Sequence, residues 1–170
     1  MAKQIRPAET GDLNRLVEIY NHYITETHVT FDTVPFAVGE RTQWFTQFSE
    51  SGPLRLLVTE IDGDVVGYAC SSPFKPKPGY SSSVETSIYL DPDHVGRGLG
   101  RPLYGRLLDE LEAEGSLHRA YGGVALPNPA SIELHEQLGF VKVADYNEVG
   151  HKFGEFWNVS WYEKDLSGNT

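Results

Sequence analysis

The stretch VETSIYLDPDHVGRGLG, residues 84–100, decides the fold of this chain. Its first seven residues alternate in polarity, which predicts a strand, and a turn with three glycines then leads into an amphipathic helix. Gly96, Gly98 and Gly100 stand where that helix begins. A helix start has unpaired backbone N–H groups that attract anions, and glycine lets a phosphate approach the backbone closely. The stretch therefore predicts an anion site, with one carboxylate, Glu85, on the strand that leads to it.

Several kinds of loop carry glycines in this position. A P-loop requires GxxxxGK followed by Ser or Thr, which the sequence lacks. A dinucleotide-binding loop requires GxGxxG early in a βαβ unit, whereas this chain has GxGxG after strands that we expect to be antiparallel. A third kind holds the pyrophosphate of an acyl-coenzyme A, and a glycine turn without a ligand is the structural alternative. Arg97 and Arg101 beside the loop favour a phosphate ligand in this acidic chain.

Composition predicts a single globular domain over residues 1–170, long enough to bury a real core. The net charge of −10 argues against a nucleic-acid or anionic-membrane binder, because such proteins need a basic field. The single cysteine, Cys70, excludes an internal disulfide and fits a reducing compartment. The first residues contain no apolar signal region, and no apolar run approaches the length of a membrane span. We therefore expect a cytoplasmic protein.

The periodicity of apolar residues predicts a mixed α+β order of elements. Thr10 is a candidate N-cap for the first helix, and Asp62-Gly63 is a strong hairpin signal. The expected helices cover residues 13–23, 41–48, 103–111 and 131–138. The expected strands cover residues 4–7, 54–61, 65–69, 82–90, 119–125, 141–145 and 156–162. Antiparallel hairpins thus come first, and a strand–helix–strand–helix–strand core follows.

Several segments together resemble a known family. HVGRGLG, residues 94–100, resembles the acyl-coenzyme A loop of the GNAT superfamily, usually written (Q/R)xxGx(G/A). LPNPASIELHEQLGF, residues 126–140, resembles the second motif of that superfamily, an Asn-led helix that ends in LGF. With NHYITETHVTF at 21–31 and VGHKFGEFWNVSW at 149–161, nearly the whole chain resembles the phosphinothricin N-acetyltransferase group. Val95 departs from the loop motif, and His135 replaces a tyrosine of many GNAT enzymes, as is common in this group.

The resemblance implies a GNAT fold, which is a mixed and mostly antiparallel twisted sheet flanked by helices. Its central strands splay and hold acetyl-CoA, and no metal is implied. The backbone of Ile88, Tyr89 and Leu90 would pair with pantetheine, because a splayed strand has unpaired N–H and C=O groups. Asn128 would contact the cofactor from the second motif. The pyrophosphate would be wrapped by Gly96, Arg97, Gly98, Leu99, Gly100 and Arg101. The six histidines are scattered without an HxxxH or HExxH pair, which agrees with the absence of a metal site.

Glu85 is the candidate general base, because it aligns with the acidic residue of the group. An amine substrate is mostly protonated at neutral pH and must lose a proton before it attacks the thioester. An exposed strand glutamate without a catalytic role is the alternative. His135 is a second catalytic candidate that could orient the substrate or relay a proton, and a packed helix histidine is equally compatible. The acid that protonates the leaving thiolate could be His135, a tyrosine or water.

Substrate-binding candidates come from three segments. Lys75 and Lys77 could pair with a substrate carboxylate or phosphinate, although solvated surface lysines have the same pattern. Lys152 is a further candidate anion partner. Aromatic side chains that could wall the pocket, or pack in the core or rim, are Phe31, Phe74 and Tyr80.

The activity implied by the resemblance is transfer of acetyl from acetyl-CoA to the α-amine of a small amino acid or analogue, by direct attack in a ternary complex. Phosphinothricin, methionine sulfoximine and methionine sulfone are the acceptors to which it points, with resistance or detoxification as the role. Two alternatives stay open: a protein N-terminus or polyamine as the acceptor, and a non-catalytic acyl-CoA-binding module. The resemblance also implies a homodimer. The aromatic tail that could form its interface, the pocket wall or internal packing comprises Phe153, Phe156, Trp157 and Trp161.

Overall fold

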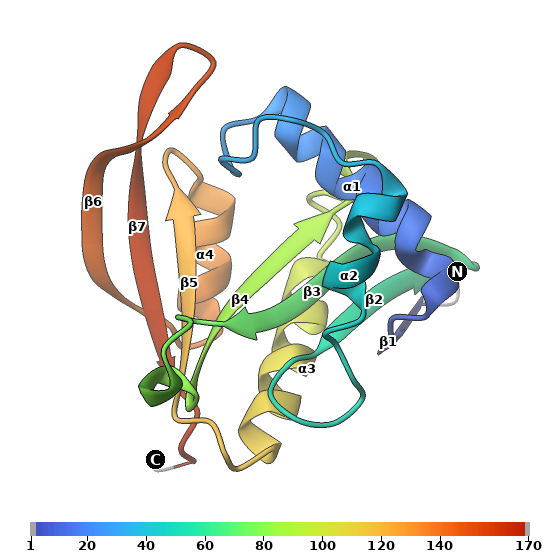
Figure 1. The fold of residues 1–170 in the computed structure, drawn as a ribbon, viewed down its shortest axis with the longest axis vertical. Helices are drawn as coiled ribbons and strands as arrows, with labels where there is room; N and C mark the ends of the chain where they lie inside the picture. The colour runs from blue at the N-terminus through green and yellow to red at the C-terminus, as the bar shows by residue number, and fades with distance from the viewer. Residues whose placement is uncertain (1–2, 169–170) are drawn as a thin grey trace.

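A computed structural model describes residues 3–168 and shows one seven-stranded sheet with helices on both faces (Figure 1). The strands are β1 (Lys3–Pro7), β2 (Leu56–Ile61), β3 (Asp64–Pro73), β4 (Ser83–Leu90), β5 (Arg119–Ala125), β6 (Val141–Lys152) and β7 (Glu155–Asp165). The helices are α1 (Leu13–Glu26), α2 (Thr42–Phe45), α3 (Gly100–Ala113) and α4 (Pro129–Gln137). The order in the sheet is β1-β2-β3-β4-β5-β7-β6, and among these described strands only β4 and β5 run parallel. The expected α+β fold with a mostly antiparallel sheet is confirmed.

Each face of the sheet has its own core. One core packs α3 against the sheet, and the five predicted apolar residues of that helix are all buried: Leu103, Tyr104, Leu107, Leu108 and Leu111. The other core lies under α1 and α2 and contains Leu16, Ile19 and Tyr68. Because side chains alternate along a strand, neighbouring residues of β4 face different cores. Val84 belongs to the α3 core, whereas Tyr89 packs against the α1 core.

The start of α1 differs from the expectation. Thr10 does not cap it but opens a short 3-10 turn, and the helix itself begins at Leu13. The Asp12 carboxylate accepts the Glu9 N–H at 2.8 Å and the Arg6 guanidinium at 2.7 Å. A carboxylate held by Arg6 is a stronger acceptor for that N–H than a threonine hydroxyl. The N-cap prediction for Thr10 is therefore wrong.

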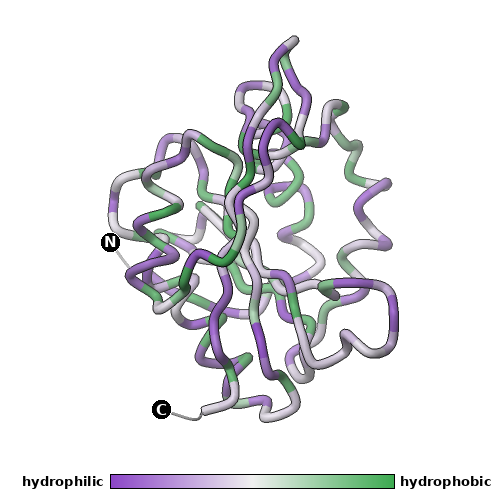
Figure 2. The backbone as a smooth tube through the Cα atoms, turned by 90° about the vertical axis from the view of Figure 1, so that its left-hand side faces the viewer, coloured by the Kyte–Doolittle hydropathy of each residue, from purple (hydrophilic) through white to green (hydrophobic). Residues whose placement is uncertain are grey.

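The last two strands form a longer hairpin than expected, since β6 continues to Lys152 and β7 begins at Glu155. Phe153 and Gly154 both have positive φ, at 55° and 76°, which suits a tight hairpin turn. Figure 2, viewed from the β6 side, shows this hairpin running along the long axis of the molecule. Polar and apolar residues mix along residues 146–152, so the period-2 signal that predicts a strand is weak there.

The parallel pair β4–β5 separates soon after it starts. Pairing covers only Ser83–Glu85 of β4 against Arg119–Tyr121 of β5, and the two strands then diverge. The remaining residues of β4 still pair with β3 on their other side. The sheet is therefore open between its two central strands, as the splayed arrangement requires, and the ends of α3 and α4 border the opening (Figure 1).

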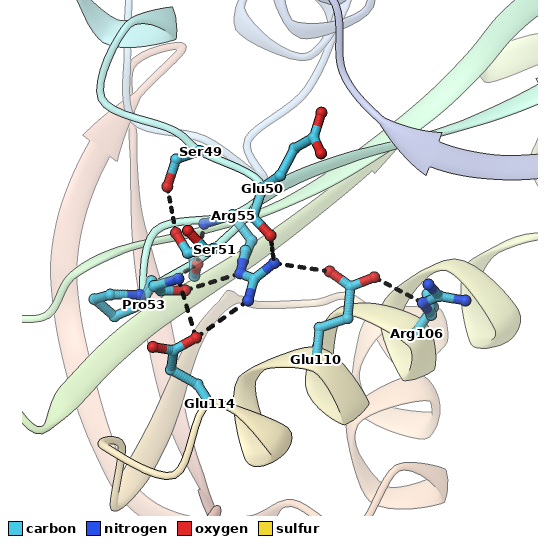
Figure 3. A network of polar contacts seen from close by, with 10 residues as sticks. Ser49, Glu50, Ser51, Pro53, Arg55, Arg106, Glu110 and Glu114 are labelled. Carbon is cyan, nitrogen blue, oxygen red and sulfur yellow. Dashed lines mark hydrogen bonds and ion pairs between the residues drawn. The ribbon is translucent and has the colours of Figure 1, made fainter.

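A polar network fastens the other end of α3 to the loop before β2 (Figure 3). The Arg55 guanidinium donates to the Gly52 carbonyl at 2.8 Å and to the Glu50 carbonyl. It also forms ion pairs with Glu114 at 3.2 Å and Glu110 at 3.5 Å. Only 12% of the Arg55 side chain is exposed, so its charge is screened little by water. Arg55 thereby anchors the helix whose opposite end carries the glycine loop.

We expect Arg55→Met to lower the free energy of unfolding by about 1–3 kcal/mol, because it leaves two half-buried carboxylates and two loop carbonyls without their donor. The matched control is Arg106→Met, which removes an exposed guanidinium that pairs with the same Glu110. That change should cost about 0.5 kcal/mol or less. Urea unfolding of both variants measures the difference, and equal losses would contradict the anchoring role.

Candidate active site

A cavity of about 640 Å³ occupies the opening between β4 and β5. Its walls come from the second half of β4, the glycine loop, the end of β5 and the length of α4, together with Tyr23 and Val29. Eight of the ten residues predicted to contact the cofactor line it: Ile88, Tyr89, Leu90, Gly96, Gly98, Gly100, Arg101 and Asn128. Arg97 and Leu99 do not line it, since Arg97 is exposed and the Leu99 side chain is buried in the protein.

The glycine loop has the backbone shape that an anion cradle needs. Gly96 and Gly98 have φ of 77° and 72°, and a Cβ on either would meet no atom within 4 Å. The loop backbone is thus open to a ligand on the sides where side chains would stand. Helix α3 starts at Gly100, so its unpaired N–H groups and the Arg101 side chain adjoin the same cavity. These features fit a pyrophosphate.

Fewer than the expected three residues of β4 have backbone groups that face the opening. The Asp91 N–H donates to the Val66 carbonyl of β3 at 2.9 Å. Backbone groups alternate in direction along a strand, so those of Tyr89 also face β3, whereas those of Ile88 and Leu90 face the opening. The Leu90 carbonyl already accepts the Tyr23 hydroxyl at 2.5 Å. Backbone pairing in the opening is therefore left to Ile88 and Leu90, and the prediction for the Tyr89 backbone is corrected.

Glu85 lies at the point where β4 and β5 separate, directly across from Tyr121. Its side chain is half-buried on the α1 face of the sheet, the same face as Tyr89. Burial raises the pKa of the Glu85 carboxyl, and the nearby Lys75 ammonium partly opposes this rise. Glu85 itself does not line the cavity, which begins on β4 at the next residue, Thr86. A carboxylate with a raised pKa is a better proton acceptor than an exposed one with an ordinary pKa.

Aromatic rings surround the α1 face of this position. Phe74 stacks on Tyr121 with ring centroids 4.3 Å apart and meets the Trp161 ring edge-on at 6.1 Å. Tyr80 packs edge-on against Phe74 at 6.0 Å. The predicted Phe74 and Tyr80 thus come together beside Glu85 with two rings that sequence reasoning missed as neighbours. The strand register that pairs Tyr121 with Glu85 depends on the folded sheet, and no local signal in the sequence indicates it.

The two lysines of the same loop are exposed. The Lys75 ammonium lies 5.1 Å from the centre of the Phe74 ring, which brings its charge to the aromatic group beside Glu85. Lys77 precedes the 3-10 turn Pro78–Tyr80. Both positions leave the ammonium groups accessible to an anionic ligand.

His135 is buried on the opposite face of the sheet. Its Nδ1 lies 2.7 Å from the Ser131 carbonyl and its Nε2 lies 3.2 Å from the Tyr104 hydroxyl, which contacts the Thr86 hydroxyl at 2.7 Å. A carbonyl only accepts, so Nδ1 carries the proton and Nε2 accepts from Tyr104. Burial also lowers the pKa of His135. The imidazole is therefore a neutral acceptor, which does not suit the donor role considered for the leaving thiolate.

Two predicted substrate contacts are placed differently from expectation. Lys152 is buried, and its ammonium donates to the carbonyls of Thr30 at 2.7 Å and Tyr23 at 3.3 Å. It therefore holds backbone and is not a free cation for a substrate anion, which corrects that prediction. The Phe31 ring packs on Gly150 of β6 and does not line the cavity. Phe31 thus contacts β6 and not the interior of the cavity.

Cys70 is buried in β3, and burial raises the pKa of its thiol to about 12. This thiol is therefore not activated as a nucleophile. In residues 3–168 no helix is long and apolar enough to cross a membrane. The same part of the chain contains no group of three metal-ligating side chains.

Comparisons with known proteins agree with this geometry. Residues 16–140 match the model of the acetyltransferase (GNAT) family. The chain is 50% identical to the phosphinothricin N-acetyltransferase of Streptomyces coelicolor over 165 residues, which is 96% of both chains. It is 35% identical to the L-methionine sulfoximine/L-methionine sulfone acetyltransferase of Salmonella typhimurium, over 95% of this chain and 94% of that one. A solved acetyltransferase from Salmonella typhimurium with its cofactor acetyl-CoA has a TM-score of 0.94 and 34% identity, covering 100% of this chain and 97% of that one. The resemblance to the phosphinothricin group is confirmed.

Proposed function

Because the chain belongs to the acetyltransferase (GNAT) family, we propose that it transfers acetyl from acetyl-CoA to the α-amine of a small amino acid or analogue. Phosphinothricin, methionine sulfoximine and methionine sulfone are the acceptors that the names of its relatives suggest. The observation that carries the proposal is Glu85, a half-buried carboxylate at the point where β4 and β5 separate, next in sequence to Thr86, which lines the cavity. We further propose that residues 1–170 act as a single N-acetyltransferase domain.

Each part of the cavity has a proposed task. The glycine loop and Arg101 would hold the pyrophosphate, and Ile88 and Leu90 would bind pantetheine through their backbone groups. Asn128 caps α4 by accepting the Ser131 N–H at 3.2 Å, and it borders the same cavity. Acetyl-CoA supplies the acetyl group as a thioester.

Glu85 would take the proton of the acceptor amine, directly or through one water, in a ternary complex of both substrates. An N–H of β4 that faces the opening would polarise the thioester carbonyl. His135 lines the cavity and would hold β4 in place, since it accepts from Tyr104, whose hydroxyl contacts Thr86 of β4. The departing thiolate would take its proton from water or from the nitrogen of the tetrahedral intermediate, which still carries protons after Glu85 has taken the first, because the Nε2 of His135 carries none.

Lys75 and Lys77 would recognise the acidic group of the acceptor. We expect the double change Lys75→Met with Lys77→Met to raise the KM of methionine sulfone about tenfold, because two charge-assisted contacts are lost. The decarboxylated analogue of the same acceptor, which carries no carboxylate, should be acetylated equally well by both proteins. Steady-state rates on the two acceptors measure this comparison. If the double variant handles both acceptors like the unmodified enzyme, the lysines have no role in recognition.

We also propose a cytoplasmic homodimer. The β6–β7 hairpin exposes large apolar side chains, with exposed fractions of 51% for Tyr146, 57% for Val149, 58% for Phe153 and 65% for Phe156. Large exposed apolar side chains gathered on one strand pair are a feature of protein–protein interfaces, and this supports the proposal. Sedimentation equilibrium should find twice the mass of the chain. A monomer at micromolar concentration would contradict this part of the proposal.

A further inference from the structure

A short segment after α1, residues 27–32, joins the two sides of the cleft, and we call it the strap. In Figure 1 it leaves the upper end of α1 and turns toward the upper ends of β5 and β7. Val29 of the strap and Tyr23 of α1 line the cavity. On the α1 side, the Tyr20 hydroxyl contacts the Thr30 hydroxyl at 2.8 Å and donates to the Asp32 carboxylate at 2.5 Å. The strap is therefore a wall of the cavity with its base on α1.

The other side of the strap rests on the β6–β7 hairpin. The ring of Phe31 lies against Gly150 so closely that a Cβ there would overlap it. The His28 ring stacks on Trp157 with centroids 4.1 Å apart and an angle of 14° between the planes. These contacts use one glycine and three flat rings, so the strap packs closely on the hairpin.

Lys152 of the β6–β7 hairpin makes hydrogen bonds to both the strap and α1. Its ammonium donates to the Thr30 carbonyl of the strap at 2.7 Å and to the Tyr23 carbonyl in the last turn of α1 at 3.3 Å. The residue is only 4% exposed. No carboxylate lies within ion-pair distance of this ammonium in residues 3–168.

The stability of the buried Lys152 ammonium depends on the position of the strap. A buried ammonium has lost its hydration and is stable only while other groups replace the water. The Tyr23 carbonyl belongs to the end of α1, where the helix dipole is negative and favours a cation. The Thr30 carbonyl is the nearer of the two acceptors, so displacing the strap would leave the buried charge poorly satisfied. The hydrogen bond from Lys152 therefore stabilises the strap in its observed position.

Resting on the proposed function, we infer that Lys152 is a positioning residue that fixes the acceptor side of the cavity through the strap and so controls acceptor affinity. The strap packs on α1, which covers the face of the sheet that carries Glu85. The glycine loop leads into α3, which covers the opposite face. Val29 of the strap and the glycine loop line the same cavity, but within residues 3–168 no hydrogen bond joins Lys152 or the strap to that loop. We therefore expect binding of acetyl-CoA to depend on Lys152 less than binding of the acceptor does.

The first test is Lys152→Met, which keeps the length of the side chain and removes its charge. With methionine sulfone as the probe, we expect the acceptor KM to rise about tenfold, while the KM of acetyl-CoA and kcat change less than about twofold. Lys142→Met is the matched control, because Lys142 is an exposed lysine of the same strand that pairs with Asp145. Lys142→Met should leave the acceptor KM, the KM of acetyl-CoA and kcat unchanged. A uniform loss of activity with both KM values unchanged would indicate a purely structural role and overturn the inference.

The second test is Gly150→Ala, which keeps Lys152 and displaces the strap by pushing on Phe31. It should raise the acceptor KM in the same way, and the double variant should show less than the product of the two single effects, because both changes release one strap. If Lys152→Met fails to fold, Gly150→Ala decides alone, and an unchanged acceptor KM overturns the inference. An unmodified protein that acetylates no amine would overturn the proposed function, and this inference with it.

Discussion

Glu85→Gln should lower kcat about 10²–10⁴-fold, the usual contribution of a general base. Glutamine keeps the size of the side chain and cannot accept the proton of the amine. Glu85 sits on the α1 face where β4 and β5 separate, and the glycine loop follows the other end of β4. The affinity for acetyl-CoA, measured by calorimetry, should therefore stay within about twofold.

The pH profile sharpens this prediction. Burial raises the pKa of Glu85, so kcat/KM of the unmodified enzyme should fall as the pH drops through a value above that of an ordinary glutamate. The direction follows because only the deprotonated carboxylate accepts a proton. Glu85→Gln should lose this acidic limb. Glu155→Gln, on an exposed glutamate of β7, is the control and should keep both the rate and the limb. A Glu85→Gln variant with a normal rate would exclude Glu85 as the base.

Gly98→Ala should raise the KM of acetyl-CoA about ten- to hundredfold. Gly98 has a φ of 72°, which costs alanine about 1–2 kcal/mol, so the loop would relax to another shape. The added methyl group would also stand in the open space next to the backbone that we assign to the pyrophosphate.

Gly115→Ala is the matched control for this change. Gly115 has a φ of 71° and open space around its Cβ, but it lies beyond the C-terminal end of α3. Both variants therefore carry the same backbone strain and should lose similar thermal stability. Only Gly98→Ala should weaken cofactor binding. An equal acetyl-CoA KM in the two variants would show that the loop does not hold the pyrophosphate.

The elements that sequence patterns predicted well are those with a strong local period. The apolar face of residues 103–111 recurs every three or four residues, and all five of its predicted members are buried. The strand 119–125 has the predicted bounds. The glycine signal after β4 also has the geometry expected of it, since two of its glycines adopt positive φ. Each of these signals depends on neighbours within one or two turns.

The features that were missed depend on partners far away in the chain. Lys152 reads as a free cation in HKFG, yet its acceptors are 122 and 129 residues away. Phe31 reads as a pocket wall, but its place against Gly150 appears only when the strap meets the hairpin. Tyr89 lies within the predicted free edge, and only the register with β3 shows that its backbone is used there. Burial and long-range pairing, which a single sequence does not display, decide these cases.

His135 illustrates the same limit for chemistry. A histidine on a helix near a cofactor loop is compatible with an acid, a base or a packed side chain. Its hydrogen bonds to the Ser131 carbonyl and the Tyr104 hydroxyl fix one neutral tautomer, and that tautomer accepts a proton and does not supply one. Only the folded environment of the ring selects among these roles.

The most direct measurement of the central claim is acceptor-dependent acetyl transfer by the unmodified protein. Acetyl-CoA is mixed with phosphinothricin, methionine sulfoximine or methionine sulfone, and free thiol release is followed while mass spectrometry identifies the acceptor product. We predict thiol release that requires the acceptor, together with a product that carries one acetyl group on its amine. Binding of acetyl-CoA without thiol release, with these acceptors and with peptide N-termini and polyamines, would contradict the account.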